Sequence, residues 1–183
     1  MQHQPSICVR QADHLPEVEA RKMQIVVGVA DMKISNQSQQ VVVTHALGSC
    51  IGVAVYDPKV RVGGLLHYML PESSLDEEKG RQSPCMFADT GIPLLFRECY
   101  KLGATKQRML VKIAGGSQVL GGPEHFNIGR RNYAALRKIF LKNNVLIDNE
   151  DVGGVKARTM YLEIATGRVW VKIIGQNQEI KDL

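Results

Sequence analysis

The stretch Thr44-His45-Ala46-Leu47-Gly48-Ser49-Cys50-Ile51-Gly52-Val53-Ala54-Val55-Tyr56 decides how the middle of this chain folds. It leads through Asp57-Pro58-Lys59 into a second apolar, β-prone run from Val62 to Leu70. Aspartate and proline favour a turn, because proline fixes a backbone angle that turns require. The pattern therefore predicts a β-hairpin whose first strand begins at Cys50 and whose second strand carries His67.

The register of this hairpin places the thiol and the imidazole together. A turn centred between Pro58 and Lys59 pairs Asp57 with Val60 and Cys50 with His67. Directly opposed side chains have Cβ atoms about 5 Å apart, which is within reach of a hydrogen bond. A bulge at Gly63-Gly64 would shift the register by one residue and place the two side chains on opposite faces.

A nucleophilic cysteine needs a base, a group that orients the base, and donors for the developing oxyanion. Cys50 is the candidate nucleophile and His67 the candidate base. A further strand predicted at Val41 to Val43 ends at Thr44, whose hydroxyl lies near the same corner and suits the orienting role.

The small residues before the cysteine suit an oxyanion site. Gly48 and Ser49 offer backbone N–H groups without bulky side chains. If His67 activates Cys50 as a thiolate, the thiol should titrate well below the pKa of roughly 8.5 of a free cysteine.

Each of these residues also has an ordinary structural explanation, since a cysteine in an apolar strand is usually a small buried hydrophobe. A metal site formed by Cys50, His67 and either His45 or Cys85 is a second functional interpretation. The chain lacks the C-x-x-C or H-x-x-x-H pairs that zinc sites usually show, which favours the nucleophile. His45 follows Thr44 directly, so on a strand it faces the other way and is interpreted as structural.

The segment from Thr44 to Pro71 resembles the signature of the bacterial chemoreceptor glutamine deamidase family, CheD, in its pattern T-x-x-L-G-S-C followed by G-G-x-x-H-x-M-L-P. The later motifs of the family follow in the same order, and the resemblance covers roughly residues 25 to 174. These motifs are Phe87-Ala88-Asp89-Thr90-Gly91-Ile92-Pro93, Lys112-Ile113-Ala114-Gly115-Gly116, Phe126-Asn127-Ile128-Gly129-Arg130-Arg131-Asn132 and the segment from Glu150-Asp151-Val152-Gly153-Gly154 to Arg158.

The resemblance implies a protein-glutamine glutaminase that converts glutamine side chains of methyl-accepting chemotaxis receptors into glutamate and releases ammonia. It assigns Cys50 as nucleophile, His67 as general base and acid, and Thr44 as the residue that positions the histidine, with no cofactor and no metal. The cytoplasmic domains of the receptors would be the substrate, and a CheC-type phosphatase a further partner. The alternative is a non-catalytic adaptor that binds this phosphatase or the receptors. The loop from Ser117 to His125 departs from the family pattern, which bears on partner contacts.

The remaining pattern predicts an α+β domain. Residues 1 to 22 are expected to be a loose extension and residues 23 to 183 a single domain. Both hairpin strands are apolar on both faces and so require cover on each side. The resemblance implies a layered α-β-β-α sandwich similar to deamidases of the cytotoxic necrotizing factor type. One helix is expected to start at Asp89-Thr90 and to end before Gly103, and a second to run from Gly129 to Lys142. A loop is expected at 72–82. The further strands are expected at 25–30, 108–114, 145–148, 159–165 and 169–174.

The glycine pairs Gly115-Gly116 and Gly121-Gly122 lack the spacing of a phosphate-binding loop. They instead predict a close backbone approach to the corner that carries Cys50.

Composition narrows the function classes. The net charge is +5, but the basic residues are scattered and aromatic residues make up only 5% of the chain, so a single-stranded nucleic acid is not the expected partner. No apolar stretch reaches the roughly 18 residues of a membrane span, and no signal peptide is evident, so we expect a cytoplasmic protein. The four cysteines show no disulfide-like clustering, and a reducing compartment would keep Cys50 as a free thiol.

Overall fold

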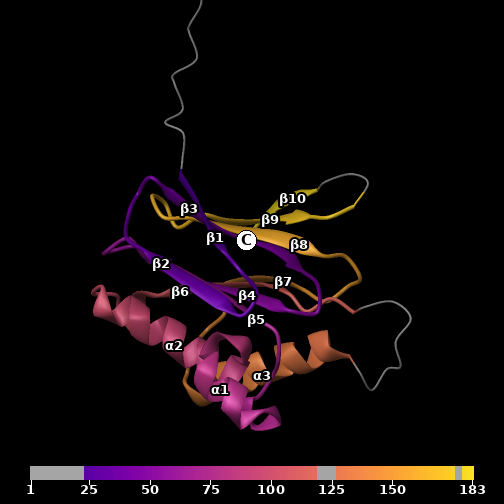
Figure 1. Ribbon diagram of the computed structural model, residues 1–183. Coiled ribbons are helices and arrows are strands. Elements are labelled where there is room, and N and C mark those ends of the chain that lie inside the picture. The colour runs from indigo at the N-terminus through magenta and orange to yellow at the C-terminus, as the bar shows by residue number, and fades with distance from the viewer. Residues whose placement is uncertain (1–22, 119–126, 176–178) are drawn as a thin grey trace, which may run out of the picture.

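Figure 1 shows the computed structural model, which describes residues 23–118, 127–175 and 179–183. Two five-stranded sheets lie face to face, and the described helices all cover the outer face of one of them (Figure 1). The expected α+β class is confirmed, while the described residues form three layers, in the order α-β-β, of the four that were expected. The extension at residues 1–22 and the pair Gly121-Gly122 lie outside the described residues.

The sheet without helices, called sheet A, has the strand order β1-β3-β8-β9-β10. Strands β1 and β3 pair in parallel, with Val27 opposite Thr44, and the other neighbours are antiparallel. The strands are β1 (Met23–Val27), β3 (Gln40–Leu47), β8 (Arg158–Glu163), β9 (Val169–Ile173) and β10 (Ile180–Asp182).

The helix-covered sheet, called sheet B, has the order β2-β5-β4-β6-β7. The predicted hairpin forms its centre, as β4 and β5, and all residues of these two strands are buried. The strands are β2 (Asp31–Ser35), β4 (Ile51–Asp57), β5 (Val62–Tyr68), β6 (Leu110–Gly115) and β7 (Asn149–Val152).

Two helices form most of the third layer. Helix α2 (Ala88–Lys101) begins earlier than predicted, so Asp89 lies inside its first turn, where its carboxylate accepts hydrogen bonds from Ser73. Helix α3 (Ile128–Lys142) begins after Asn127, whose side chain accepts a hydrogen bond from the Arg130 N–H at 3.0 Å. The shorter helices are η1 (Ser73–Leu75), α1 (Glu77–Gln82), η2 (Pro84–Met86) and η3 (Lys106–Arg108). The loop expected at 72–82 is therefore partly helical.

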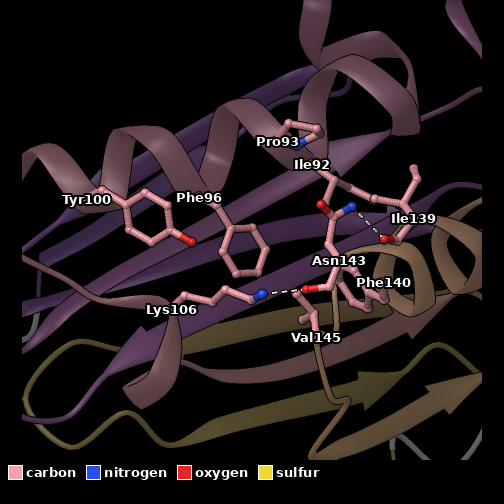
Figure 2. Close-up of a pocket in the computed structure, with 9 residues that line it drawn as sticks. All are labelled: Ile92, Pro93, Phe96, Tyr100, Lys106, Ile139, Phe140, Asn143 and Val145. Atoms are coloured by element: carbon pink, nitrogen blue, oxygen red, sulfur yellow. Dashed lines mark hydrogen bonds between the residues drawn. The ribbon is translucent and has the colours of Figure 1, made fainter.

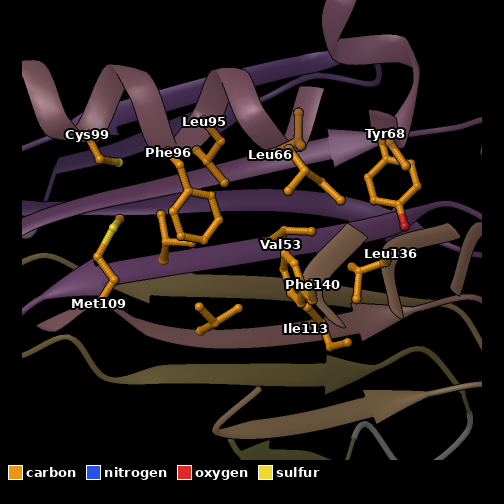
Figure 3. Packing of buried hydrophobic residues seen from close by; sticks show 14 of the residues in the cluster. Val53, Leu66, Tyr68, Leu95, Phe96, Cys99, Met109, Ile113, Leu136 and Phe140 are labelled. Atoms are coloured by element: carbon orange, nitrogen blue, oxygen red, sulfur yellow. The ribbon is translucent and has the colours of Figure 1, made fainter. Parts of the chain in front are cut away.

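The alternating faces of β4 explain why it is apolar throughout. Ile51, Val53 and Val55 pack toward α2 and α3, whereas Ala54 and Tyr56 pack between the sheets. Figure 3 shows the helix-side core, in which the side chains of α2 and α3 meet those of sheet B. Fully burying one such aliphatic side chain contributes roughly 1.5–3 kcal/mol, so this central strand stabilises both interfaces.

The hairpin register differs by two residues from the prediction. Asp57 pairs with Val62, and His67 pairs with Gly52 instead of Cys50, because the turn spans residues 58–61 and Arg61 adopts a left-handed conformation with φ 52°. No bulge interrupts β5 at Gly63-Gly64. A shift of two preserves the faces of the side chains, so the pairing partner was wrong but the shared face was not.

Other boundaries also differ from the prediction. The strand expected at 145–148 is instead β7 at Asn149–Val152, because α3 ends in a turn at Asn143 and Asn144. The expected strand at 25–30 is replaced by β1 and β2, which belong to different sheets. No helix within the described ranges has the length and apolar character needed to cross a membrane.

Asp57 is a buried carboxylate at the turn end of the hairpin. It accepts hydrogen bonds from the backbone N–H groups of Lys59 and Thr105 and from the Arg108 guanidinium at 2.7 and 3.0 Å. Burial by itself would raise the pKa of Asp57, but these hydrogen bonds outweigh it and hold the pKa below its ordinary value.

Replacing Asp57 with Ala should therefore lower the free energy of unfolding by about 3 kcal/mol at pH 7, because Arg108 and two N–H groups lose their acceptor. A depressed pKa stabilises the fold above the ordinary Asp pKa and loses this effect as the pH falls through the folded value, so the difference should shrink below about pH 4. Urea unfolding at pH 7 and pH 3 measures both effects. Asp182→Ala, which removes the exposed partner of Arg168, should leave the midpoint unchanged; an equal loss there would contradict the assignment.

Candidate active site

His67 and Thr44 meet between the two sheets. His67 lies on β5 of sheet B and is 1% exposed, and Thr44 lies on β3 of sheet A and is 0% exposed. Nδ1 of His67 lies 2.8 Å from Oγ1 of Thr44. The structure therefore brings together two of the three residues that the sequence placed at this corner.

The hydrogen bonds of Thr44 determine the histidine tautomer. Oγ1 of Thr44 donates its single proton to the backbone carbonyl of Val27, at 2.9 Å. It can therefore only accept from His67, so Nδ1 of the imidazole carries the proton. Nε2 is then the unprotonated nitrogen, and among the described residues it has no hydrogen-bond partner. This is the state that a general base requires.

Cys50 lies directly before β4 and is partly exposed. It packs against the cluster between the sheets, on the same side as His67. Because Gly52 is opposite His67, Cys50 is the diagonal neighbour of the imidazole, and such neighbours have Cα atoms about 7–8 Å apart. Cys50 and His67 share a face, as expected, without being directly opposed.

Three consecutive carbonyl groups hold the segment that ends at Cys50. The carbonyl of Gly48 accepts from the Ser117 N–H at 2.8 Å, and that of Cys50 from the Gly116 N–H at 2.8 Å. Between them, the Ser49 carbonyl accepts from Nδ2 of Asn132 at 3.0 Å. The loop after β6 and helix α3 therefore fix the backbone around the thiol.

The predicted close approach of Gly115-Gly116 to this corner is confirmed. Gly115 has φ 112°, and a Cβ atom there would come within 2.3 Å of the Cys50 carbonyl oxygen. A Cβ atom at Gly129, in the first turn of α3, would lie 2.5 Å from the Gly116 carbonyl oxygen. Only glycine allows these three backbone segments to come so close together.

One of the two N–H groups predicted to be open to a substrate, that of Gly48, is already hydrogen-bonded within the loop. Gly48 donates its N–H to the carbonyl of Ala46 at 2.8 Å, so this amide is not available to a substrate. Ala46 has φ 57°, which turns the chain back on itself at this point. Across the described ranges, the N–H groups of Ser49 and Cys50 have no hydrogen-bond acceptor in another residue. Of the predicted pair, Gly48 therefore has its N–H engaged within the loop, whereas Ser49 does not, and the N–H of Cys50 lies next to it in the chain.

Burial favours the neutral forms of both reactive groups. It lowers the pKa of His67 to about 4 and raises the pKa of the Cys50 thiol. At neutral pH the free protein therefore holds Cys50 as a thiol and His67 as an unprotonated imidazole. This direction is opposite to the low thiol pKa that the sequence pattern predicted.

A buried arginine braces the loop that follows β6. Arg158 donates to Oγ of Ser117 at 2.6 Å, to the Gly153 carbonyl at 2.8 Å and to the Asp151 carboxylate at 2.6 Å. Ser117 in turn donates its N–H to Gly48. The motif from Glu150 to Arg158 thus supports the corner indirectly, because Arg158 holds Ser117 and Ser117 holds Gly48.

Two groups that hydrogen-bond at this corner, the Val27 carbonyl and the Asn132 side chain, were not predicted from the sequence. The Val27 carbonyl comes from β1, whose parallel pairing with β3 has no local sequence signal. Asn132 belongs to a motif that was noted, but nothing in the sequence indicated its contact with Ser49.

His45 is exposed on the opposite face from Thr44, as expected, and its Nδ1 lies 3.4 Å from the Thr159 hydroxyl. Within the described part of the chain, no three His, Cys, Asp or Glu side chains cluster closely enough to hold a metal ion.

An apolar hollow of about 190 Å³ between α2 and α3 is a separate feature (Figure 2). Phe96 and Phe140 line it, and both belong to the core between sheet B and the helices. Cys50 packs on the other side of sheet B, so the hollow does not open onto the thiol.

The fold and the corner define an α+β protein with a buried, oriented imidazole on the same face as a partly exposed thiol. A family model described as CheD chemotactic sensory transduction matches residues 69–173, starting two residues after His67. A relative from Syntrophus aciditrophicus, named "Probable chemoreceptor glutamine deamidase CheD 1", is 57% identical over 151 residues, which are 82% of this chain and 94% of the relative. A "Probable chemoreceptor glutamine deamidase CheD" from Solibacter usitatus is 48% identical over 157 residues, 86% of this chain and 93% of the relative.

The chain belongs to the CheD family. The matches to these relatives cover most of both chains, whereas the family model alone does not reach Thr44, Cys50 or His67.

The lowered pKa of His67 predicts that its ring stays neutral down to about pH 4. As the pH falls from 6.5 toward 4, the unfolded chain binds a proton at His67 and the folded chain does not, so the free energy of unfolding should decrease in this window. Histidine-selective NMR titration measures the pKa, and nitrogen shifts identify the Nδ1-protonated tautomer. Thr44→Val should abolish the preference for this tautomer. A folded His67 that titrates near the value found in urea would contradict the prediction.

The raised pKa of Cys50 makes an equally direct prediction. Iodoacetamide should alkylate Cys50 with a midpoint above the roughly 8.5 of a free cysteine, because the thiolate is the reactive form and burial disfavours it. Peptide mass spectrometry separates Cys50 from the other cysteines, and unfolded protein supplies the reference curve. A midpoint below that of the unfolded protein would show that His67 activates the thiolate before substrate binds.

Proposed function

We propose that this chain hydrolyses the side-chain amide of glutamine residues on chemotaxis receptors, forming glutamate and ammonia. The observation that carries the proposal is the hydrogen bond from Nδ1 of His67 to Thr44, which leaves Nε2 as a base on the same face as Cys50. The names of the relatives from Syntrophus aciditrophicus and Solibacter usitatus support the reaction class and the substrate.

The first half of the reaction would form a thioester. Nε2 of His67 takes the thiol proton while the sulfur of Cys50 attacks the amide carbon of the glutamine. Because the thiol pKa is raised, proton transfer accompanies the attack instead of preceding it. The N–H groups of Ser49 and Cys50 would stabilise the negative oxygen of the tetrahedral intermediate. Catalytic hydrogen bonds are often long in free enzymes and shorten when substrate binds, which accounts for the diagonal spacing of Cys50 and His67.

The second half would release both products. The protonated imidazole gives its proton to the leaving amide nitrogen, so ammonia departs and a γ-glutamyl thioester with Cys50 remains. Nε2 then accepts a proton from water as that water attacks the thioester carbon. Collapse of the intermediate frees glutamate and returns a proton to the sulfur. Thr44 holds the ring in one tautomer throughout, because its own proton is committed to Val27.

Docking on a CheC-type phosphatase stays a prediction from the resemblance, and a non-catalytic adaptor stays the alternative function. The geometry favours a catalytic role over a purely docking role. A docking surface does not require a buried imidazole whose Nε2 has no hydrogen-bond partner among the described residues.

The test is incubation with a glutamine-bearing receptor cytoplasmic fragment, read by mass spectrometry as conversion of amide to acid and by ammonia release. Cys50→Ala and His67→Ala should each lower kcat/KM by roughly 10³-fold or more. Thr44→Val should lower it by roughly 10²-fold, through loss of the oriented base, and Thr44→Ser should restore most of the activity.

Two control variants replace residues of the same types elsewhere in the structure. His45→Ala removes the neighbouring histidine of β3, which faces away from Thr44, and Cys85→Ala removes another partly exposed thiol. Both should keep native activity. Binding of the fragment without conversion by the native chain, or conversion that survives Cys50→Ala, would sink the proposal; the first result would favour the adaptor.

A further inference from the structure

We propose that Asn132 of α3 is a positioning residue that sets the distance between Cys50 and His67. The inference rests on the proposed function and adds a residue to its machinery. Asn132 is 0% exposed, and its Nδ2 group donates to two carbonyls, that of Ser49 at 3.0 Å and that of Met69 at 2.7 Å. One carbonyl directly precedes the candidate nucleophile, and the other follows the candidate base by two residues.

The sheet does not hold the Ser49 and Met69 carbonyls together. The pairing of β4 with β5 stops at Ile51 and Tyr68, so His67 is the second-last paired residue of β5 and Cys50 lies one residue beyond the paired part of β4. Beyond this pair the second strand turns away, since Met69 and Leu70 both donate their N–H groups to the Met86 carbonyl. Asn132 bridges the two chains at the point where the ladder ends.

The chemistry of the side chain suits this bridge. A carboxamide nitrogen carries two N–H groups, one for each carbonyl, whereas aspartate offers acceptors only. Serine has a single donor on a shorter side chain. Of the residue types of similar size, asparagine alone supplies two donors from one nitrogen.

Helix α3 is held rigidly enough for the bridge to transmit position. The hydroxyl of Tyr68 donates to the Asn132 carbonyl at 2.8 Å, and Figure 3 shows this tyrosine close to the helix. One turn earlier, Gly129 brings the helix into backbone contact with Gly116 and Ser117. The side chain of Asn132 therefore projects from an anchored helix into the corner.

The pattern of unpartnered atoms points to the same place. Among the described residues, two buried side-chain polar atoms lack a hydrogen-bond partner: Nε2 of His67 and Oδ1 of Asn132. Buried polar atoms without partners reduce stability, and their retention is typical of functional sites. His67 lies one residue before the end of β5, and Asn132 contacts the carbonyls of Ser49 and Met69, just beyond the ends of β4 and β5.

The test compares Asn132→Ala with Leu136→Ala, which lies one turn further along α3 and packs in the helix-side core, away from Cys50. Thermal melts first establish that both variants fold. With the receptor fragment, we expect Asn132→Ala to lower kcat by roughly 10²-fold with little change in KM, because misplacement by about 1 Å has that effect. Leu136→Ala should keep native kcat well below its melting temperature, even though it loses as much stability or more.

A second measurement does not depend on the receptor. Loosening the corner should expose Cys50 and relieve the burial that raises its thiol pKa, so iodoacetamide at pH 8 should alkylate it about threefold faster or more in Asn132→Ala. Leu136→Ala should match the native rate. If Asn132→Ala does not fold, Asn132→Asp serves instead, since it keeps the side-chain shape and removes both donors.

The outcomes separate the two proposals. If the native chain converts the fragment, native kcat in Asn132→Ala, or an equal loss in Leu136→Ala, overturns the positioning role. If the native chain does not convert the fragment, the proposed function fails, and the alkylation comparison alone decides: an unchanged rate in Asn132→Ala overturns the positioning role, and a selective increase supports it.

Discussion

One hydrogen bond that crosses between the sheets organises the candidate site. It joins His67 of sheet B to Thr44 of sheet A, and its direction is set by a second bond, from Thr44 to the Val27 carbonyl. That carbonyl is in place because β1 runs parallel to β3, with Val27 opposite Thr44. A strand with no reactive side chain of its own therefore decides which imidazole nitrogen is free.

The corner around Cys50 depends mainly on the backbone. The carbonyls from Gly48 to Cys50 are all used as acceptors, and they face the loop after β6 and helix α3. With the carbonyls engaged on that side, the N–H groups of Ser49 and Cys50 have no acceptor in another residue of the described part of the chain. Three glycines, at 115, 116 and 129, make this possible by removing the Cβ atoms that would otherwise separate the segments. Thr44, His67 and Asn132 are the buried side chains whose hydrogen bonds reach this corner.

Local patterns were enough to predict the hairpin, both long helices and the terminal hairpin of β8 and β9. These elements have strong apolar periodicity or clear turn residues, so their own sequence specifies them. The face shared by Cys50 and His67 also followed, because strand faces alternate strictly. The exact register did not, since it depends on a four-residue turn in which Arg61 adopts a left-handed conformation without a glycine.

Non-local features lay beyond the sequence. β2, β7 and β10 are short and largely exposed or half-buried, and they carry no distinct apolar period. The pairing of β1 with β3 and the reach of Asn132 to Ser49 join segments separated by other elements, which one sequence does not encode in any local window. Thr44, Cys50 and His67 could be named as candidates from the residues alone; the Val27 carbonyl and Asn132 required the structure.

The face of sheet A that points away from sheet B carries the only tryptophan of the chain. Trp170 of β9 stacks on Tyr161 of β8, with ring centroids 5.0 Å apart and planes within 3° of parallel. Intrinsic tryptophan fluorescence is thus a probe of one layer, the sheet that contributes Thr44. Far-ultraviolet circular dichroism is weighted instead toward α2 and α3, which cover the sheet that contributes His67. If the two layers unfold at different denaturant concentrations, the two spectra give different midpoints, and if they unfold together, the midpoints coincide. No added label is needed.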